Sequence, residues 1–343
     1  MKVGLLLLGL LSIAFAIPTE EKWQVPQKDG TKKWMTESEL ERLLAEETEK
    51  PIPEDDGIIY YLYTRNNPTE PQVLKLDDKK TLASSFFSTN YHTKVIIHGW
   101  LGDTESVLTK LIEPFVNQNG VWNNVIFVDW SKYAMTLNYA GARLKVPMVG
   151  RQVAKFLDQL HQFGGMSFNK LTVIGHSLGT HVVGFAGKSV ELGKIHTIYG
   201  LDPTDVLFDS KKPYQRLNST DAEYVETIHT NGQWLGFLHP IGQASFYPNW
   251  GKSQPGCEKD LSGYCSHARC VDFFVEAIQM GEGNQFIPTE CADYQDVKKK
   301  KGCTLKTSGV KMFDTANHKR VSGMFYLPTK AEAPWGEGVF YEK

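Results

Sequence analysis

The chain has 343 residues, of which 41% are hydrophobic and 22% are charged. This composition is ordinary for a globular protein and excludes a disordered chain, and the length suits one large domain or two small ones. The formal net charge of −2 gives no electrostatic reason to expect a nucleic-acid partner.

Residues 1–16 have the pattern of a cleavable secretory signal. Lys2 precedes an apolar run at residues 5–15, and the segment closes on Ala14-Phe15-Ala16. A charged start, a short apolar centre and small residues at the end are typical of such signals. The run is shorter than the ~20 residues that a membrane-spanning helix needs. We therefore expect cleavage after Ala16 and a secreted, extracellular protein.

Residues 17–56 form an acidic extension with twelve acidic and six basic residues. Thr36 and Glu39 have the spacing of a helix capping box. Leu40, Leu43 and Leu44 then give one apolar stripe, which predicts a short helix ending before Pro51. The extension is interpreted as a loose surface segment, with a removable pro-segment or an interaction arm as the alternative.

Residues 57–343 are predicted to form a single α/β domain, without internal repeats or a linker. Continuous apolar strands separated by helices imply a mostly parallel sheet covered on both faces. The expected strands are Ile58–Tyr63, Lys94–His98, Val125–Val128, Leu171–Ile174, Ile195–Leu201 and Tyr224–His229, and the expected helices are Ser106–Asn117, Val149–Phe163 and one that begins near His267.

Residues 175–179, Gly-His-Ser-Leu-Gly, match G-x-S-x-G, the turn that carries the nucleophile of α/β-hydrolases. The bare pentapeptide is expected by chance in about one of ten chains of this length. The neighbouring sequence must therefore show whether it marks a nucleophile or a coincidental turn. A buried-strand pattern at residues 171–174 precedes it, and residues 180–187 can continue as a helix. The motif requires this strand–turn–helix arrangement, and its glycines permit the sharp turn. We predict that Ser177 is a nucleophile.

A serine nucleophile needs a histidine base, which in turn is oriented by an acid. In this fold class the acid follows the serine and precedes the histidine along the chain. Asp202 follows the predicted strand ending at Leu201, which puts it at the strand end where such sheets bind ligands. Asp202 is the predicted acid, and Asp205 and Asp209 are rivals that fall later in the loop.

Position alone leaves the base open among the histidines that follow Asp202. His229 lies inside a strand pattern, which is typical of a core or sheet-end residue. His267 is expected in a loop held by Cys265, just ahead of a helix. The other two candidates are His239 and His318.

Two backbone N–H groups are predicted to stabilise the oxyanion of a tetrahedral intermediate. Leu178 supplies one, as the residue after the nucleophile. The other is assigned to Trp100, because His98-Gly99-Trp100 follows an early apolar strand. The alternative is that this segment is an ordinary turn at a strand end.

Taken together, these motifs resemble the pancreatic lipase family, which includes secreted neutral lipases and the venom phospholipases A1 of insects. The resemblance runs from about Ile58 to the end of the chain. It implies Ser177 as nucleophile, Asp202 as acid and His267 as base, with an oxyanion hole at the N–H groups of Trp100 and Leu178. The matching segments are His98–Trp100, Val128–Trp130, Gly175–His181, Gly200–Pro203, Asp221-Ala222, Ile228–Thr230, Phe246–Asn249 and Cys265–Arg269.

The chain departs from that family in its length and in its lid. Pancreatic lipases carry an added β-sandwich domain that engages colipase, whereas this chain stops near Trp335, where the first domain would end. We therefore expect a monomer without colipase. The lid of such lipases is a long disulfide-bounded loop before the catalytic histidine, and here Cys257 and Cys265 enclose only Glu258–Tyr264.

The family's calcium site is also altered. Arg216, Asn218 and Asp221 occupy its region, but Pro213 stands where a glutamate ligand is expected. We predict no metal ion and no other cofactor.

Export makes the five cysteines candidates for disulfides. Short loops favour the pairs Cys257–Cys265 and Cys291–Cys303, in agreement with the family pattern, and Cys270 is then expected to stay free. The sequon at Asn218 predicts N-glycosylation.

The leading hypothesis is a phospholipase A1-like esterase that acts on phospholipids or galactolipids at a membrane or lipid-aggregate surface. The alternatives are a triacylglycerol lipase and, in another class, a non-catalytic lipid-binding or yolk-type storage protein. Residues 234–238, Trp-Leu-Gly-Phe-Leu, are either core or an anchor for the lipid interface.

Overall fold

The computed structural model describes residues 22–26, 32–36, 38–39, 42 and 57–338. In the extension, β1 (Lys22–Pro26) and β2 (Lys32–Thr36) form an antiparallel pair that the sequence did not predict. The predicted capping box is confirmed: the N–H of Thr36 donates to Glu39 Oε2 at 2.8 Å, and the N–H of Glu39 donates to Thr36 Oγ1 at 3.2 Å. The signal segment and the leucine stripe of the expected helix lie outside the described residues.

The main domain is built on a sheet of eleven strands in the order β12-β11-β13-β10-β9-β8-β7-β5-β6-β3-β4. The strands from β13 to β6 in that order run parallel, and antiparallel pairs flank them at both ends. The strands are β3 (Ile59–Thr64), β4 (Asn67–Leu74), β5 (His92–Ile97), β6 (Asn123–Asp129), β7 (Leu171–His176), β8 (Thr197–Leu201), β9 (Tyr224–Ile228), β10 (Ala244–Pro248), β11 (Thr289–Cys291), β12 (Leu305–Lys306) and β13 (Gly323–Leu327).

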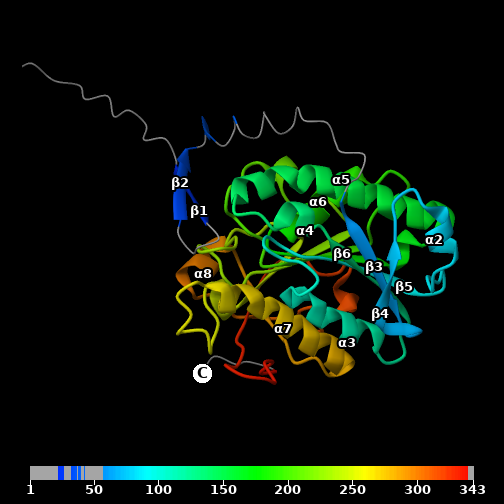
Figure 1. The fold of residues 1–343 in the computed structure, drawn as a ribbon. Helices are drawn as coiled ribbons and strands as arrows, with labels where there is room; N and C mark the ends of the chain where they lie inside the picture. The colour runs from blue at the N-terminus through cyan, green and yellow to red at the C-terminus, as the bar shows by residue number, and fades with distance from the viewer. Residues whose placement is uncertain (1–21, 27–31, 37, 40–41, 43–56, 339–343) are drawn as a thin grey trace, which may run out of the picture.

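Helices cover both faces of this sheet, with α4, α5 and α6 on one face and α3 and α7 on the other (Figure 1). The α-helices are α2 (Lys79–Ala83), α3 (Ile112–Val116), α4 (Ser131–Ala134), α5 (Tyr139–Gly164), α6 (Gly179–Ser189), α7 (Tyr264–Met280) and α8 (Tyr294–Lys299). The 3₁₀-helices are η1 (Val107–Leu111), η2 (Phe168–Lys170), η3 (Pro213–Gln215), η4 (Asn249–Gly251), η5 (Gly281–Gly283) and η6 (Thr315–Asn317).

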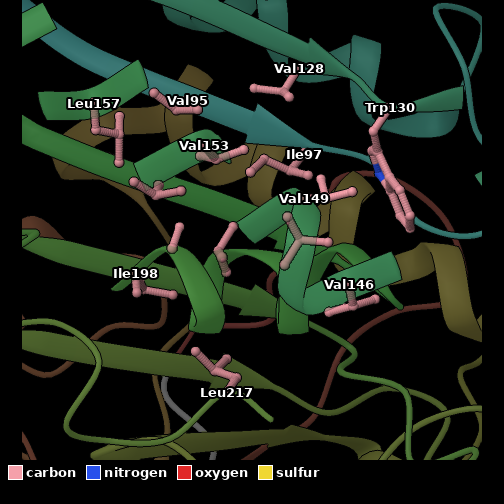
Figure 2. Packing of buried hydrophobic residues seen from close by; sticks show 14 of the residues in the cluster. Val95, Ile97, Val128, Trp130, Val146, Val149, Val153, Leu157, Ile198 and Leu217 are labelled. Atoms are coloured by element: carbon pink, nitrogen blue, oxygen red, sulfur yellow. The ribbon is translucent and has the colours of Figure 1, made fainter. Parts of the chain in front are cut away.

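The strands are apolar on both faces because each face packs against helices. Along β5, Val95 and Ile97 belong to the core under α5, and Ile96 between them belongs to the core on the opposite face. This alternation follows from the two-residue period of a strand. Figure 2 shows Val149 and Val153 of α5 packed against the β5 side of the sheet.

The predicted parallel α/β architecture is confirmed, and each of the six predicted strands is present within two residues of its expected start. The prediction for the long helix was too short. It begins at Tyr139 rather than Val149, capped by the Asn138 side chain, which accepts from the N–H of Gly141 at 3.1 Å. Pro147 inside the first turns hid this beginning, because proline usually marks a helix boundary. Within the described part of the chain, each helix is too short or too polar to cross a membrane.

Candidate active site

Ser177 stands on the turn between β7 and α6. Its φ is +55°, which a residue with a Cβ adopts only at a cost of order 1–3 kcal/mol. The backbone holds it there, because the N–H of Ser177 donates to the carbonyl of Leu201 in β8 at 3.0 Å. Thr180 Oγ1 also donates to the carbonyl of Ser177 at 2.6 Å. The hydroxyl is therefore presented at the carboxyl edge of the sheet on a fixed backbone.

The glycines of this turn are required by close backbone contacts. A Cβ on Gly175 would lie 2.5 Å from the carbonyl oxygen of Gly179, and a Cβ on Gly179 would lie 2.4 Å from the carbonyl oxygen of His98. Gly99 approaches the turn from β5, and a Cβ there would lie 2.8 Å from Ser177 Cβ. Side chains at these positions would force the turn and the β5 loop apart. This role of Gly99 was not predicted from the sequence.

Asp202 and His267 form a buried pair beside this turn. His267 Nδ1 donates to Asp202 Oδ2 at 2.5 Å, and the two side chains are 6% and 0% exposed. Asp202 Oδ1 accepts from the N–H groups of Thr230 and Asn231 at 2.7 and 2.9 Å. The carboxylate is thus oriented from both sides, and the imidazole is held with Nδ1 toward Asp202. These two backbone donors, Thr230 and Asn231, follow β9. In the sequence, only the family match at Ile228–Thr230 pointed to this segment.

His267 lies in the first turn of α7 and not in a loop ahead of a helix, which corrects the prediction. Gly263, with φ +79°, precedes the helix, and α7 begins at Tyr264. The helix brings His267 against the serine turn, because His176 Nε2 donates to the carbonyl of His267 at 2.9 Å and the two rings are 4.7 Å apart. Burial and the neighbouring His267 lower the pKa of His176 to about 3, which keeps its ring neutral.

The other candidate histidines have partners elsewhere. His229 is fully buried, with Nδ1 2.7 Å from the carbonyl of Phe237 and Nε2 2.9 Å from Thr227 Oγ1, and burial lowers its pKa to about 4. His239 stacks on Tyr294 at 5.1 Å, and His318 lies 3.4 Å from Glu223. Of the four, His267 is the one hydrogen-bonded to Asp202.

The two rival acids lie in the loop beyond Asp202. Burial, and then the charge of Asp202, raise the pKa of Asp205 to about 7. Asp209 caps its own turn by accepting from the N–H of Lys211 at 2.7 Å. Neither of the two is hydrogen-bonded to a histidine within the described residues.

Leu178 follows the serine directly, and Trp100 follows Gly99, which approaches the serine turn from the end of β5. Within the described residues, neither backbone N–H donates a hydrogen bond to another protein group. The loop that carries Trp100 is fixed by its neighbours: Trp130 Nε1 donates to the carbonyl of His98 at 2.7 Å, and Trp100 Nε1 donates to the carbonyl of Thr136 at 2.8 Å. The His98 side chain also connects this loop to the segment after β6, because its Nε2 accepts from the N–H of Trp130 at 3.1 Å.

The loop Glu258–Tyr264 leads directly into the helix that carries His267. Both expected disulfides are present, Cys257–Cys265 at the base of this loop and Cys291–Cys303 further along, and Cys270 is free and buried. Trp234 Nε1 donates to the carbonyl of Ser262 at 2.9 Å, which ties the loop to the segment before it. In that segment the indole of Trp234 is 48% exposed, whereas Phe237 and Leu238 are buried. The segment is therefore core at one end and surface at the other.

Asp221, one of the residues that the resemblance puts in the region of the family's calcium site, forms an ion pair with Lys188. Lys188 Nζ lies 2.5 Å from Asp221 Oδ2, and the same oxygen accepts from the N–H of Asn218 at 2.8 Å. The guanidinium of Arg216 donates to the backbone carbonyls of Leu217 and Ser210. The Asp221 carboxylate is therefore paired with a protein cation in this structure.

A parallel sheet covered by helices on both faces, with a serine on a sharp turn after a central strand and an acid–histidine pair beside it, defines an α/β-hydrolase. The model of the Lipase family matches residues 25–335. The chain belongs to this family, and the resemblance to pancreatic lipases is confirmed.

Three curated relatives illustrate the range of the family. Inactive pancreatic lipase-related protein 1 of Homo sapiens is 35% identical over 73% of this chain and 57% of its own length. Pancreatic triacylglycerol lipase of Myocastor coypus is 33% identical over 68% of this chain and 55% of its own length. Phospholipase A1 of Polybia paulista is 34% identical over 85% of this chain and 93% of its own length.

This chain therefore spans little more than half the length of the two pancreatic relatives. Membership of the family does not by itself establish activity, because one of these relatives is named inactive.

Proposed function

We propose that this protein is a secreted serine esterase that hydrolyses acyl esters of polar lipids. The observation that carries the proposal is the hydrogen bond between His267 and Asp202 next to the positive-φ turn of Ser177. These are the three side-chain types that acyl transfer requires, at the edge of the sheet where α/β-hydrolases bind substrate.

In the proposed reaction Ser177 Oγ attacks the ester carbonyl carbon, and His267 Nε2 accepts its proton. The N–H groups of Leu178 and Trp100 donate to the oxygen that becomes negative. The intermediate collapses when His267 returns the proton to the departing alcohol, which leaves the acyl group on Ser177. A water molecule then attacks the acyl-enzyme with His267 again as base, and the free fatty acid is released. Asp202 stabilises the imidazolium and holds its tautomer.

The short loop supports a polar-lipid substrate. A long amphipathic lid covers a large apolar mouth in water and extends it onto an oil surface when it opens. Glu258–Tyr264 offers two large apolar side chains, Leu261 at 91% exposure and Tyr264 at 54%. The loop is also held in place, because Asp260 accepts from the N–H groups of Ser262 and Cys265 at 2.9 and 2.6 Å. We therefore expect that the entrance to the Ser177 site is already open in water. Such an entrance has little apolar surface left to uncover at a lipid interface, and it tolerates a polar head group.

The substrate class is tested on the purified protein with phosphatidylcholine, galactolipid and triolein, each below and above its aggregation threshold. We expect faster turnover of the polar lipids and little activation at the interface. Faster turnover of triolein with a sharp rise at the interface would identify a triacylglycerol lipase instead. Turnover of no substrate, with Ser177 also unreactive toward a phosphonate, would support the non-catalytic alternative.

The secretion part of the proposal rests on the N-terminal signal pattern and the sequon at Asn218. Asn218 is half-exposed, and its Nδ2 donates to Thr220 Oγ1 at 3.0 Å. We expect the secreted protein to begin after Ala16 or, if the acidic extension is a pro-segment, near residue 57. N-terminal sequencing distinguishes these cases. Removal of N-glycans should lower the mass of the wild type but not that of Asn218→Gln.

A further inference from the structure

The sheet has a second ligand-sized site at the edge opposite to Ser177. A cavity of about 970 Å³ lies where β5, β7 and β8 begin, between α3 and the end of α7. This volume is at the upper end of the range for small-molecule sites. Thr172 of β7 lines it, and Ser177 follows five residues later on the same strand direction, which places the two edges roughly 16 Å apart.

A buried lysine reaches this cavity. Lys94 of β5 is 8% exposed, and its Nζ lies 3.1 Å from Thr172 Oγ1 on the neighbouring strand. Among the described residues no carboxylate lies within ion-pair distance of that ammonium, although a lysine offers three donors. Burial lowers the pKa of Lys94 to about 8. A buried cation without an anionic partner is costly, and an anion bound in the cavity would supply that partner.

One side of the wall near Lys94 is aromatic and aliphatic, whereas His92 and His196 lie among the polar lining residues. Phe274 of α7 is the centre of a cluster, with its ring 5.7 Å from Phe115, 4.2 Å from Phe313 and 4.9 Å from Tyr199. Ile278 continues this surface one turn later on α7. The lining of the cavity thus combines one buried cationic group with a cluster of apolar side chains.

We propose that this cavity binds a long-chain carboxylic acid, with the carboxylate on Lys94 and Thr172 and the acyl chain along Phe115, Phe274 and Ile278. A single negative charge fits better than a phosphate with two, because the rim also carries the carboxylates of Glu113 and Glu282. The proposal goes beyond the esterase activity and does not depend on it, since no residue of this site lies at the serine edge.

The test uses Ser177→Ala, so that hydrolysis cannot disturb the measurement. Isothermal titration calorimetry follows the binding of dodecanoate, dodecan-1-ol and acetate. We expect dodecanoate to bind at one site and acetate to bind weakly, because both the charge and the chain are needed. Adding Lys94→Met should weaken dodecanoate binding by about tenfold or more and leave dodecan-1-ol unchanged. The matched control is Lys170→Met, a rim lysine whose Nζ donates to the carbonyl of Asn90 and which should change little.

Two further measurements keep the test decisive if Lys94→Met folds poorly. Thr172→Val preserves the shape of the side chain but removes its hydroxyl, and it should weaken dodecanoate binding by about threefold or more. A photoreactive fatty acid should label peptides from α3 and the end of α7. Dodecanoate affinity that is unchanged in Lys94→Met, or labelling confined to the Trp234 segment and its surroundings, would overturn the proposal.

Discussion

The two edges of the sheet hold their ionisable groups in opposite ways. At the carboxyl edge, Asp202 accepts three hydrogen bonds, from His267 and from the N–H groups of Thr230 and Asn231. At the amino edge, Lys94 Nζ lies 3.1 Å from Thr172 Oγ1 and 5.7 Å from the centre of the Phe115 ring, no described carboxylate pairs with it, and a cavity of about 970 Å³ lies beside it. At the carboxyl edge, protein groups supply the hydrogen-bond partners of Asp202, and a reaction centre needs such a fixed arrangement. At the amino edge, the ammonium of Lys94 remains available to a ligand, and a binding site needs such a group.

Among variants that test this difference between the two edges, Asp202→Asn is expected to have the largest effect on turnover. The amide cannot hold His267 with Nδ1–H toward it as the carboxylate does, so kcat on a polar lipid should fall by about 10³–10⁴-fold. Steady-state kinetics measure this directly. Asp209→Asn is the matched control in the same loop and should stay within about threefold of wild type. Similar losses in both variants would show that Asp202 has no special place in the site.

The close backbone contacts at the carboxyl edge are tested by Gly99→Ala. The new Cβ would lie 2.8 Å from Ser177 Cβ and 3.0 Å from the carbonyl of His176. Displacement of the turn or of the Trp100 N–H should lower kcat by about 10²-fold. Gly283→Ala is the control, since a Cβ there meets nothing within 4 Å. Wild-type turnover in Gly99→Ala would mean that the serine edge is less rigid than its geometry indicates.

The disulfide Cys257–Cys265 is expected to stabilise the rim of the same edge. It closes a loop with a sequence separation of 8 residues. Replacing both cysteines by serine should lower the free energy of unfolding by about 2–3 kcal/mol, measured by urea denaturation. Cys270→Ala, which leaves both disulfides intact, should have a smaller effect. A bridge that involves Cys270, detected by non-reducing peptide mapping, would contradict the assignment.

The smallest expected effect concerns the hydrogen bond that ties Trp234 to the loop. Trp234→Phe keeps an aromatic ring but removes the Nε1 donor to Ser262. A hydrogen bond of this kind contributes about 0.5–1.5 kcal/mol, so amide exchange at residues 262–263 should accelerate by roughly threefold to tenfold. Hydrogen exchange with mass spectrometry reports it. Unchanged exchange would show that the disulfide and Asp260 hold the loop without the indole.

The sequence predicted the central strands and the serine turn well, because both carry strong local signals. β5 to β9 are short apolar runs, and the glycines of the turn fit a known strand–turn–helix pattern. β4 and the strands from β10 to β13 were not predicted. β4 contains Pro68 and Pro71, β10 ends at Pro248, and β12 has two residues, so neither composition nor length indicated a strand.

Features that depend on tertiary contacts could not be predicted from the local sequence pattern. Gly99 is needed because Ser177, far along the chain, approaches it. His267 was placed in a loop held by Cys265, whereas the helix already begins at Tyr264, directly after Gly263. Lys94 stands at the start of an apolar strand, and only the folded sheet shows that its ammonium is buried beside a cavity.

The central claim, that Ser177 is the nucleophile of an esterase, is tested most directly by covalent labelling. A serine-directed phosphonate should add one label to the wild-type protein, and peptide mass spectrometry should locate it on Ser177. Ser177→Ala should remain folded, take up no label and hydrolyse polar lipids more slowly by about 10³-fold or more. A label on another residue, or near-wild-type turnover in Ser177→Ala, would contradict the account.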